Sequence, residues 1–427
     1  FFKVAWEIIK GDLLAAVTSF MNLSTSHLEE LNSAYIFLLP KKDDASGADH
    51  FHPISLIHSF TKIITKVLAN RLAPRLNEMI SQNQNAFVRK RAIHDNFIFV
   101  QNLVQRLHRT RKQSLFIKVD IAKAFDMVCW PYLLDVLRQF GFGNHWLNWI
   151  CNLFATSSSQ VLLNGAPGQP IPHARGLHQG DPLSPMLFIL AMEPFHWILK
   201  AAEGASILSP LESNRNRFRC SLYADDVAVF TRPDATELTT LSKLLNLFAQ
   251  VLGLHTNVAK TEIFPIRCEG IDLAPLLQIF PGTIKSFPCR YLGLPLHYRK
   301  LRKIDFLPLI EKIGLRLPTW KGRFFSSSGR ETLVKTVLSS MPIHHLSALQ
   351  MPKWVFKRID RFRRSFLWKG EDPDHSKPGS CLVNRQTMSN PKSLGGLEHP
   401  EMEKFSRALR LNGCGLNGKT RTNPRLV

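Results

Sequence analysis

The most constraining feature of the sequence is a pair of adjacent aspartates set between two short apolar runs. Residues 218–222 alternate, the motif Tyr223-Ala224-Asp225-Asp226 follows, and residues 227–230 are apolar. Two such runs joined by a short polar turn predict a β-hairpin, here with an acidic tip. Taken alone, two aspartates in a turn are more often ordinary turn chemistry than a metal site.

A third carboxylate ends another predicted strand. Residues 115–119 form a β-type run that ends at Asp120. If this strand lies beside the hairpin, Asp120 and Asp225 converge into a site of hard oxygen ligands that suits Mg²⁺. Two such ions, ~3.5–4 Å apart, lower the pKa of an attacking 3′-hydroxyl and neutralise a leaving pyrophosphate. Phosphoryl transfer needs little beyond this positioning and charge stabilisation.

A loop rich in glycine and proline precedes a predicted helix. Its sequence is Gly176-Leu177-His178-Gln179-Gly180-Asp181-Pro182-Leu183-Ser184-Pro185. Glycine permits close approach of the backbone to a ligand. The N-terminus of the following helix is expected to favour a phosphate or a polar nucleotide edge. An ordinary loop before a helix is the competing interpretation.

Composition narrows the class of partner. Lys and Arg number 55 against 33 Asp and Glu, a net charge of +22, which favours a polyanionic partner over a protein that is merely basic.

The seven cysteines are scattered without any C-x-x-C pair, which predicts free thiols in a reducing compartment and no zinc. Apolar stretches fall short of the ~18 residues of a membrane span. The chain begins without Met or a signal peptide and is interpreted as part of a longer polyprotein or as a gene fragment.

The remaining patterns mix helices and strands without strict βαβ alternation, which predicts an α+β fold. Helices are expected over most of 1–35, at 60–72, from an N-cap at Asp95 to 109, after Pro131, and at 185–200, 238–252 and 353–369. Strands are expected at 35–39 and 160–164. In the basic helix 353–369, the stripe Val355, Ile359, Phe362 and Phe366 is expected to be core.

The ordered motifs resemble those of reverse transcriptases. A strand ending at Asp120 and Phe125 comes first, then Gln179-Gly180-Asp181-Pro182-Leu183-Ser184-Pro185, then Tyr223-Ala224-Asp225-Asp226. The sequence between these motifs is similar to that of reverse transcriptases from LINE-type (non-LTR) retrotransposons, especially copies common in plants. The similar stretches are Asn85-Ala86-Phe87-Val88, Ile93-His94-Asp95-Asn96, Asp120-Ile121-Ala122-Lys123-Ala124-Phe125-Asp126, Leu190-Ala191-Met192-Glu193-Pro194, Lys260-Thr261-Glu262 and Tyr291-Leu292-Gly293-Leu294-Pro295. The resemblance covers about residues 1–370.

This resemblance implies a right-hand polymerase with fingers, a palm built on an antiparallel sheet, a helical thumb and a basic C-terminal helical extension. The implied division is an N-terminal helical extension at 1–34, fingers and palm at 35–297, a thumb-like basic helical region at 298–370 and a loose tail at 371–427. The implied activity is RNA-directed DNA polymerisation, extending a DNA primer on an RNA template from dNTPs with two Mg²⁺ ions, for which Mn²⁺ can substitute.

The resemblance also implies roles for single residues. Asp120, Asp225 and Asp226 are the catalytic, metal-binding carboxylates, and Phe125 is a steric gate that excludes a 2′-hydroxyl. The nucleotide-binding set is Lys41, His52, Phe125, Gln179, Gly180 and Lys260, and the primer grip is Tyr291, Leu292 and Gly293. For Lys260, a solvated surface lysine is an equal alternative to a group near the triphosphate. For Phe125 and the primer grip, plain packing is the alternative.

Several residues depart from the family pattern. The family usually has Arg where His52 and His178 stand, Gly at Lys90, and Cys at Ser389, which leaves Cys381 without a zinc partner. Histidine is shorter and mostly neutral at pH 7, so it replaces a guanidinium poorly. These changes are typical of a decaying copy. With no nuclease domain before residue 1, the chain is expected not to integrate by itself.

Two other functions remain open. One is a catalytically impaired relic that binds RNA or hybrid without useful synthesis. The other is an intron-maturase-like splicing factor, against which the stretch Tyr291-Leu292-Gly293-Leu294-Pro295 counts. An intracellular, nuclear location follows from the family's need for chromosomal primers, without any clear targeting signal. No membrane partner is expected, and the sequence leaves the oligomeric state open.

Overall fold

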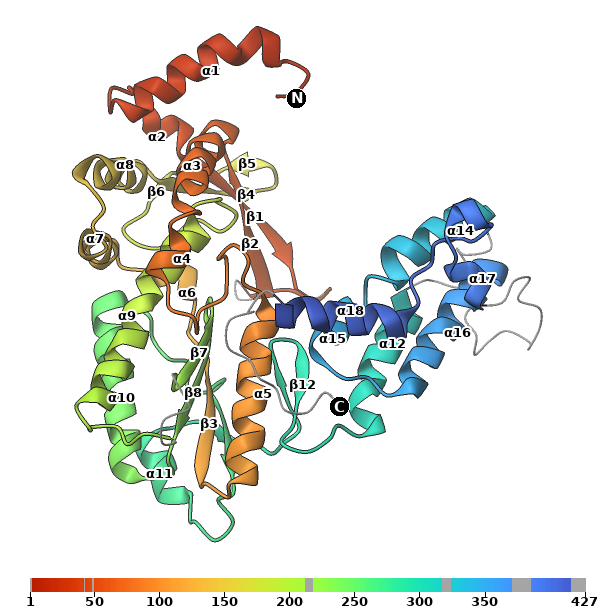
Figure 1. The fold of residues 1–427 in the computed structure, drawn as a ribbon. Helices are drawn as coiled ribbons and strands as arrows, with labels where there is room; N and C mark the ends of the chain where they lie inside the picture. Colours follow the sequence, from red (N-terminus) through yellow and green to blue (C-terminus); the bar gives the residue numbers. More distant parts are fainter. Residues whose placement is uncertain are drawn as a thin grey trace. The chain divides into compact units, whose positions relative to one another are not determined.

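The structure is a computed structural model that describes residues 2–41, 43–47, 50–211, 218–316, 324–370 and 385–415. The chain forms two compact units (Figure 1). Unit 1 comprises 1–91 and 111–285, and unit 2 comprises 92–110 and 286–427. Helices and strands are mixed without regular alternation, so the predicted α+β class is confirmed.

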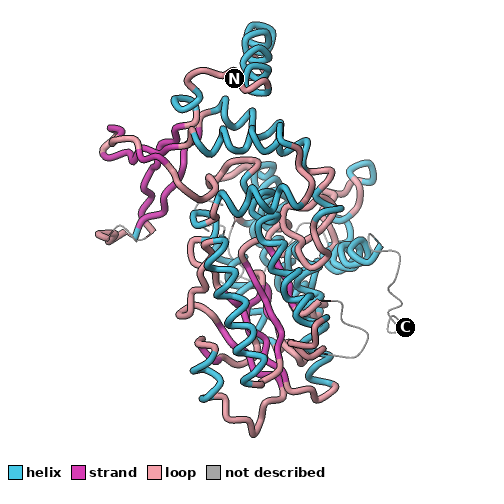
Figure 2. Tube along the Cα trace, turned by 90° about the vertical axis from the view of Figure 1, so that its left-hand side faces the viewer, coloured by secondary structure: helices cyan, strands magenta, loops and turns pink. Residues whose placement is uncertain are grey.

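Unit 1 contains two sheets, which Figure 2 shows as separate groups of strands. Its helices are α1 (Trp6–Met21), α2 (Leu28–Leu31), α3 (Ser59–Leu72), α4 (Leu76–Met79), α6 (Ala124–Met127), α7 (Trp130–Gln139), α8 (Asn144–Ala155), α9 (Ser184–Gly204), α10 (Ala235–Leu252) and α11 (Ala274–Ile279). The first sheet has the order β2-β1-β4-β5, with β6 also paired to β4. Its strands are β1 (Ser33–Pro40), β2 (Phe51–Ile57), β4 (Ser158–Leu163), β5 (Ala166–Pro167) and β6 (Ile171–Pro172).

The second sheet of unit 1 has the order β10-β9-β3-β8-β7. Its strands are β3 (Ser114–Val119), β7 (Cys220–Tyr223), β8 (Asp226–Thr231), β9 (Glu262–Ile266) and β10 (Thr283–Ile284). The four strands from β9 to β7 are antiparallel, as the palm prediction requires. Side chains alternate between the two faces of a strand. Leu115, Ile117 and Val119 therefore share one face, and all three belong to the buried core.

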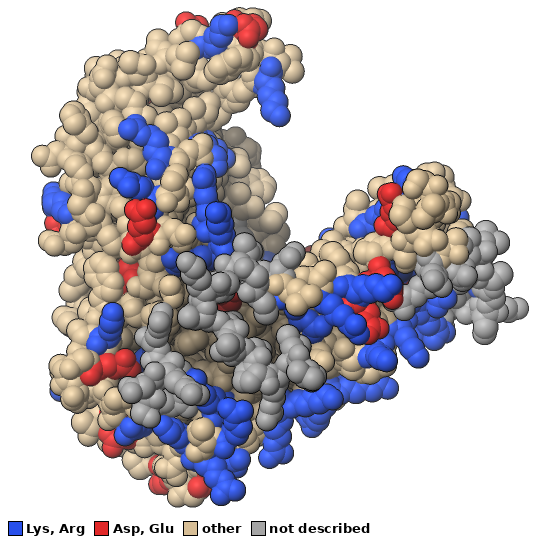
Figure 3. All heavy atoms as spheres, in the orientation of Figure 1, with Lys and Arg blue, Asp and Glu red and all other residues tan. Residues whose placement is uncertain are grey.

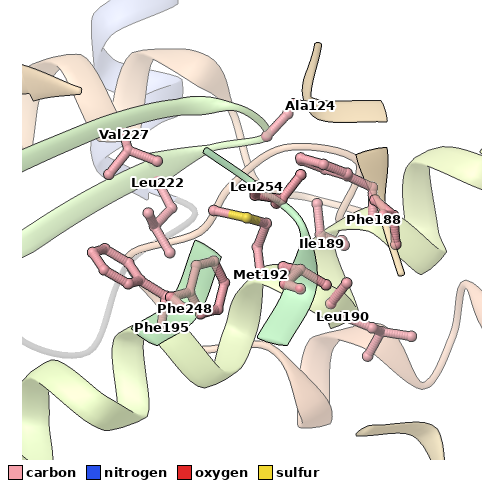
Figure 4. Packing of buried hydrophobic residues seen from close by; sticks show 14 of the residues in the cluster. Ala124, Phe188, Ile189, Leu190, Met192, Phe195, Leu222, Val227, Phe248 and Leu254 are labelled. Carbon is pink, nitrogen blue, oxygen red and sulfur yellow. The ribbon is translucent and has the colours of Figure 1, made fainter. Parts of the chain in front are cut away.

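The main core of unit 1 lies between this face and the long helices α9 and α10. Met192 and Phe195 of α9 and Phe248 of α10 pack against Leu222 and Val227 of the hairpin (Figure 4). The other face of the sheet carries Phe116, Phe230 and Phe264 in ring contact, at centroid distances of 5.1 and 5.7 Å. Both faces of the sheet thus carry buried side chains.

Unit 2 is mainly helical. Its helices are α5 (Ile93–Arg109), η2 (Lys303–Phe306), α12 (Leu307–Arg316), α14 (Ser327–Leu333), η3 (Val334–Leu338), α15 (Ile343–Ala348), α16 (Lys353–Lys369), α17 (Arg385–Ser389), η4 (Lys392–Leu394) and α18 (Met402–Gly415). Its strands β11 (Cys289–Tyr291) and β12 (Leu294–Leu296) pair antiparallel. In α16, Val355, Ile359, Phe362 and Phe366 are buried, which confirms the prediction that this stripe is core.

Two local expectations differ from the structure. Asp95 is not the N-cap of α5: the helix starts at Ile93, and the Asp95 carboxylate accepts from the backbone N–H of Ala92 at 3.1 Å. Part of the region predicted as a loose tail is helix α18, where the buried Ser406 donates to the carbonyl of Leu346. The polar composition of this region does not predict the helix, because its buried face is set by a contact with the distant helix α15.

The described residues include free cysteines and no membrane-spanning helix. Among the described cysteines, Cys129, Cys151, Cys220 and Cys268 are in no disulfide. Over the described ranges, no helix combines the length and the apolar character needed to span a membrane. The expected absence of zinc stays a prediction, since Cys381 lies outside the described residues.

Candidate active site

Three carboxylates meet where β3 ends and the β7–β8 hairpin turns. Strand β3 pairs antiparallel with β8, with Val119 opposite Val227. One more step in this register sets Asp120 opposite Asp226, and Asp225 is the next residue in the turn. The structure therefore brings the three predicted aspartates to one end of the sheet, on unit 1 alone. The register confirms the predicted hairpin and the adjacency of its two strands.

Charge repulsion marks this end of the sheet. Desolvation raises the pKa of Asp226, the Asp225 and Asp120 carboxylates raise it further, and Lys118 lowers it. Lys118 is shared, because its ammonium also lies 2.7 Å from Glu262 on β9. Like charges gathered in one place favour a bound cation, and oxygen ligands suit Mg²⁺. Among the described residues, no group of three or more His, Cys, Asp or Glu side chains is placed so that it could hold a metal ion.

The hairpin turn is held in a disfavoured conformation by a buried glutamine. Ala224 has φ +53°, a region that costs a residue with a Cβ about 1–2 kcal/mol. Its backbone N–H donates to Oε1 of Gln84 at 3.1 Å, and the same oxygen accepts from Ala86 N at 3.0 Å. Gln84 is fully buried. The sequence analysis missed this residue, although it immediately precedes the motif Asn85-Ala86-Phe87-Val88.

The segment that carries Gln84 is anchored at both ends. The Arg91 guanidinium donates to the carbonyls of Ser81 at 2.6 Å, Gln84 at 2.7 Å and Ile80 at 2.8 Å. Ser81 in turn donates from its N–H and its hydroxyl to the buried carboxylate of Glu193 in α9. Burial raises the pKa of Glu193 to about 7. The turn that presents Asp225 is therefore tied to the core helix through polar groups.

The same segment also contacts α9 and β7 through Asn83. Its side-chain amide lies 3.2 Å from Nδ1 of His196 and 3.3 Å from the carbonyl of Cys220. Burial lowers the pKa of His196 to about 4, so the ring is neutral and Nδ1 can accept from the amide. Two polar clusters thus fix the segment 81–85 against the hairpin.

Phe125 lies in the short helix α6, next to the loop 176–180. Its ring stacks on Phe188 at 4.4 Å, and its carbonyl accepts from Leu177 N at 2.7 Å. Gly176 has φ +87°, and a Cβ there would lie 2.6 Å from the carbonyl of Asp126. Only glycine fits this close approach. The loop is therefore docked against α6, with Gln179 exposed and its amide 3.4 Å from Oδ1 of Asp126.

The start of α9 is not an open anion site, contrary to the expectation from the sequence. Oδ2 of Asp181 accepts from Leu183 N at 3.1 Å and from Ser184 N at 2.9 Å. A carboxylate of the chain itself thus satisfies these helix N–H groups. Gly180, with φ +89°, has no atom within 4 Å of an added Cβ, so its backbone lies open.

His178 points into a polar network, not toward an exposed phosphate site. Its Nε2 lies 3.0 Å from Nδ1 of His173, whose Nε2 lies 2.8 Å from the hydroxyl of Ser159. Burial, with His173 nearby, lowers the pKa of His178 to about 4. A neutral ring at this position supplies no positive charge. His178, Gln179 and Asp126 line a cavity of about 290 Å³ beneath β1 and β2.

The other predicted nucleotide-binding residues are less closely grouped. Lys41 is exposed at the end of β1, and its N–H donates to His50 O at 2.9 Å. His52 lies in β2 opposite Leu39, and its side chain lies outside the described part. Lys260 is exposed just after Asn257, whose N–H donates to the carbonyl of Asp120 at 2.7 Å. The segment that carries Lys260 is therefore hydrogen-bonded to Asp120 at the end of β3.

In unit 2, the predicted primer grip forms a tight turn. Tyr291 pairs with Leu294, and Leu292 and Gly293 connect β11 and β12. Figure 3 shows Lys and Arg side chains gathered on the drawn face of unit 2. On α16, Lys353, Lys357 and Arg361 are exposed at spacings of four residues, so they form one basic stripe opposite the buried one.

Comparison with known proteins decides the family. Residues 39–296 match the family of reverse transcriptases, described as RNA-dependent DNA polymerases. The chain belongs to the reverse transcriptase family. The match includes the three carboxylates, the loop 176–180 and the primer-grip turn. The family resemblance predicted from the motifs is thereby confirmed.

Two relatives match most of this chain. It is 28% identical over 375 residues to the transposon TX1 uncharacterized 149 kDa protein of Xenopus laevis, which covers 87% of this chain and 28% of that protein. It is 23% identical over 421 residues to the Pol polyprotein of the type-2 retrotransposable element R2DM of Drosophila melanogaster, which covers 96% of this chain and 38% of that protein. The chain thus spans less than two fifths of the length of either relative.

Among solved structures, apo telomerase from Candida tropicalis is similar at a TM-score of 0.45 and 12% identity, over 84% of this chain and 67% of that one.

Proposed function

We propose that this reverse transcriptase chain is an RNA-directed DNA polymerase of a LINE-type, non-LTR retroelement, which extends a DNA primer on an RNA template. The observation that carries the proposal is the register that sets Asp120 beside Asp226 and Asp225 at one end of the sheet. The site fits hard divalent cations, since its donors are carboxylate oxygens that repel one another in the free protein.

Asp120, Asp225 and Asp226 would hold two Mg²⁺ ions, with Mn²⁺ as a substitute. When bound, such ions lower the pKa of the 3′-hydroxyl and neutralise the pyrophosphate. The chain itself supplies the fixed positions: Gln84 sets the turn, and the β3–β8 ladder sets the distance between its carboxylates. Such preorganisation is the main contribution that a protein makes to phosphoryl transfer.

The substrate roles implied by the family resemblance fall on residues of both units. Gln179 and Gly180 would contact the template strand and the nascent base pair, since both are exposed beside a cavity. Lys41, His52 and Lys260 would lie near the dNTP triphosphate. Tyr291, Leu292 and Gly293 would receive the primer end, and the basic stripe of α16 would contact nucleic-acid phosphates independently of sequence.

The proposed division of the chain keeps the family pattern. It places an extension at 1–34, fingers and palm at 35–297, a thumb at 298–370 and a C-terminal segment after that. The plant-like lineage and the nuclear destination, which chromosomal primers would require, belong to the same proposal.

Primer extension tests this function directly. The purified chain, given dNTPs, Mg²⁺ and an RNA template with an annealed DNA primer, is expected to lengthen the primer. Chelation with EDTA should stop extension, and added Mg²⁺ or Mn²⁺ should restore it. The same primer and template without dNTPs measure the background. Absence of extension with dNTPs and either Mg²⁺ or Mn²⁺ would refute the proposed activity.

The impaired relic is the second candidate, and the state of His178 favours it. A neutral, half-buried ring replaces the charged guanidinium that the family usually has there. Salt-sensitive binding of RNA without any extension would support the relic. Primer extension by the wild-type chain would rule out the impaired relic.

The steric-gate role of Phe125 predicts a change in sugar discrimination. Phe125→Val should raise ribonucleotide incorporation relative to deoxyribonucleotide by about 10–100-fold, because removal of the ring makes space for a 2′-hydroxyl. The measurement is kcat/KM for matched rNTP and dNTP. Phe188→Leu, which changes the stacked partner, is the control. Equal discrimination in wild type and Phe125→Val would leave Phe125 as a packing residue.

A further inference from the structure

The turn between β11 and β12 has an unfavourable sequence for its shape. Leu292 has φ +45° and Gly293 has φ +79°. Two-residue hairpin loops with both values positive favour Asn or Asp before Gly, and a leucine is disfavoured there. A turn of this kind needs support from outside its own four residues.

A histidine from a distant helix provides that support. Nε2 of His344, in α15, lies 2.9 Å from the carbonyl oxygen of Leu292. A Cβ on Gly293 would lie 3.5 Å from the same nitrogen, so the ring also packs against the turn. The carbonyl can only accept, so Nε2 of His344 carries the proton and donates it.

A second histidine fixes the orientation of the first. With its ring proton on Nε2, His344 offers Nδ1 as an acceptor. Nε2 of His94 lies 3.0 Å from this Nδ1 and 3.2 Å from the carbonyl oxygen of His344. Both of these atoms accept, so His94 donates from Nε2. Each hydrogen bond is therefore donated in the same direction, from His94 to His344 and from His344 to the carbonyl of Leu292.

The hydrogen-bonded chain from His94 through His344 to the Leu292 carbonyl is called the relay here, and neighbouring groups favour it. His94 lies in the first turn of α5, and burial lowers its pKa, as does the nearby His344. Asp95, its neighbour in the motif Ile93-His94-Asp95-Asn96, is occupied with the N–H of Ala92. All three members of the relay, His94, His344 and Leu292, belong to unit 2. The sequence singled out this motif, but gave His94 no role.

We propose that His344, oriented by His94, is a positioning residue that holds the Leu292–Gly293 turn in the shape that receives the 3′ end of the primer strand. The inference rests on the proposed function, in which Tyr291, Leu292 and Gly293 form the primer grip. His344 itself acts through the backbone of the turn.

Two substitutions of His344 separate positioning from plain packing. His344→Phe keeps a ring but removes the donor. His344→Gln places an amide N–H at about the position of the imidazole Nε2. His344→Phe should raise KM for the primer–template about five- to tenfold, the loss expected for one hydrogen bond, with kcat little changed. His344→Gln should restore KM to near the wild-type value.

Hydrogen–deuterium exchange of the free chain provides a readout that needs no activity. Amides of residues 289–296 should exchange faster in His344→Phe and His94→Phe, and at the wild-type rate in His344→Gln. His108→Leu, which changes a half-buried histidine of α5 stacked on Tyr298, is the control and should leave 289–296 unchanged.

The outcomes distinguish this inference from the proposed function. A wild-type chain that extends no primer refutes the function, while the exchange data still decide whether His344 holds the turn. If the wild type extends primers, an unchanged exchange rate or an unchanged primer KM in His344→Phe overturns the inference. Failure of His344→Gln to rescue KM overturns it as well.

Discussion

Asp225→Asn is expected to reduce primer extension by about 10³-fold or more, the scale for loss of one group that stabilises transition-state charge. Asparagine has nearly the same shape and is accepted in turns, so the hairpin should persist. The wild-type carboxylate raises the pKa of Asp226, which shows repulsion between the two. Removing one charge should therefore leave the free energy of unfolding equal to the wild-type value or slightly higher.

Single-turnover extension and thermal unfolding, measured on the same preparation, test this prediction. Asp135→Asn is the matched control, because Asp135 is an exposed carboxylate of α7 whose ion-pair partner is Arg138. It should extend primers at the wild-type rate. If Asp225→Asn does the same, Asp225 is not part of the metal site.

Gln84→Met is expected to lower both stability and extension. Methionine has a similar length but no acceptor, so the N–H groups of Ala224 and Ala86 lose their shared partner inside the core. Each buried donor left unpaired costs about 1–3 kcal/mol, so the loss of a partner for two donors should lower the free energy of unfolding by about 2–6 kcal/mol. Extension should fall about 10²-fold, because the turn that presents Asp225 loses its support.

Denaturant unfolding and extension rates measure the two effects. Gln139→Met, at an exposed position of α7, is the control for the same chemical change. Ala224→Gly should restore part of the extension rate in the Gln84→Met background, since glycine adopts the positive φ without strain. Wild-type extension by Gln84→Met would mean that the turn sets its own conformation.

The parts of the site that sequence reasoning could predict are those that depend on local pattern. Alternating side chains and an acidic turn predict the hairpin, and the antiparallel register then carries Asp120 to Asp226. The apolar spacing in α16 likewise predicts its buried stripe. In each case, the periodicity of one segment decides which side chains face inward.

The missed features depend on polar contacts between distant segments. Gln84 meets Ala224 across a large separation in sequence, and His344 meets Leu292 and His94 in the same way. Nothing in the local sequence marks these side chains as buried donors or acceptors. The orientation of His178 was missed for the same reason, since its partner His173 belongs to a network that only the folded loop creates.

The path of the chain between the two units limits how the gene can be truncated or recombined. Residues 92–110 belong to unit 2 but are encoded between two segments of unit 1. A gene truncated after residue 285 would keep helix α5 and lose α15, so His94 would be made without His344. The two units therefore cannot be exchanged as blocks by a single recombination, and an insertion or deletion at either border affects both.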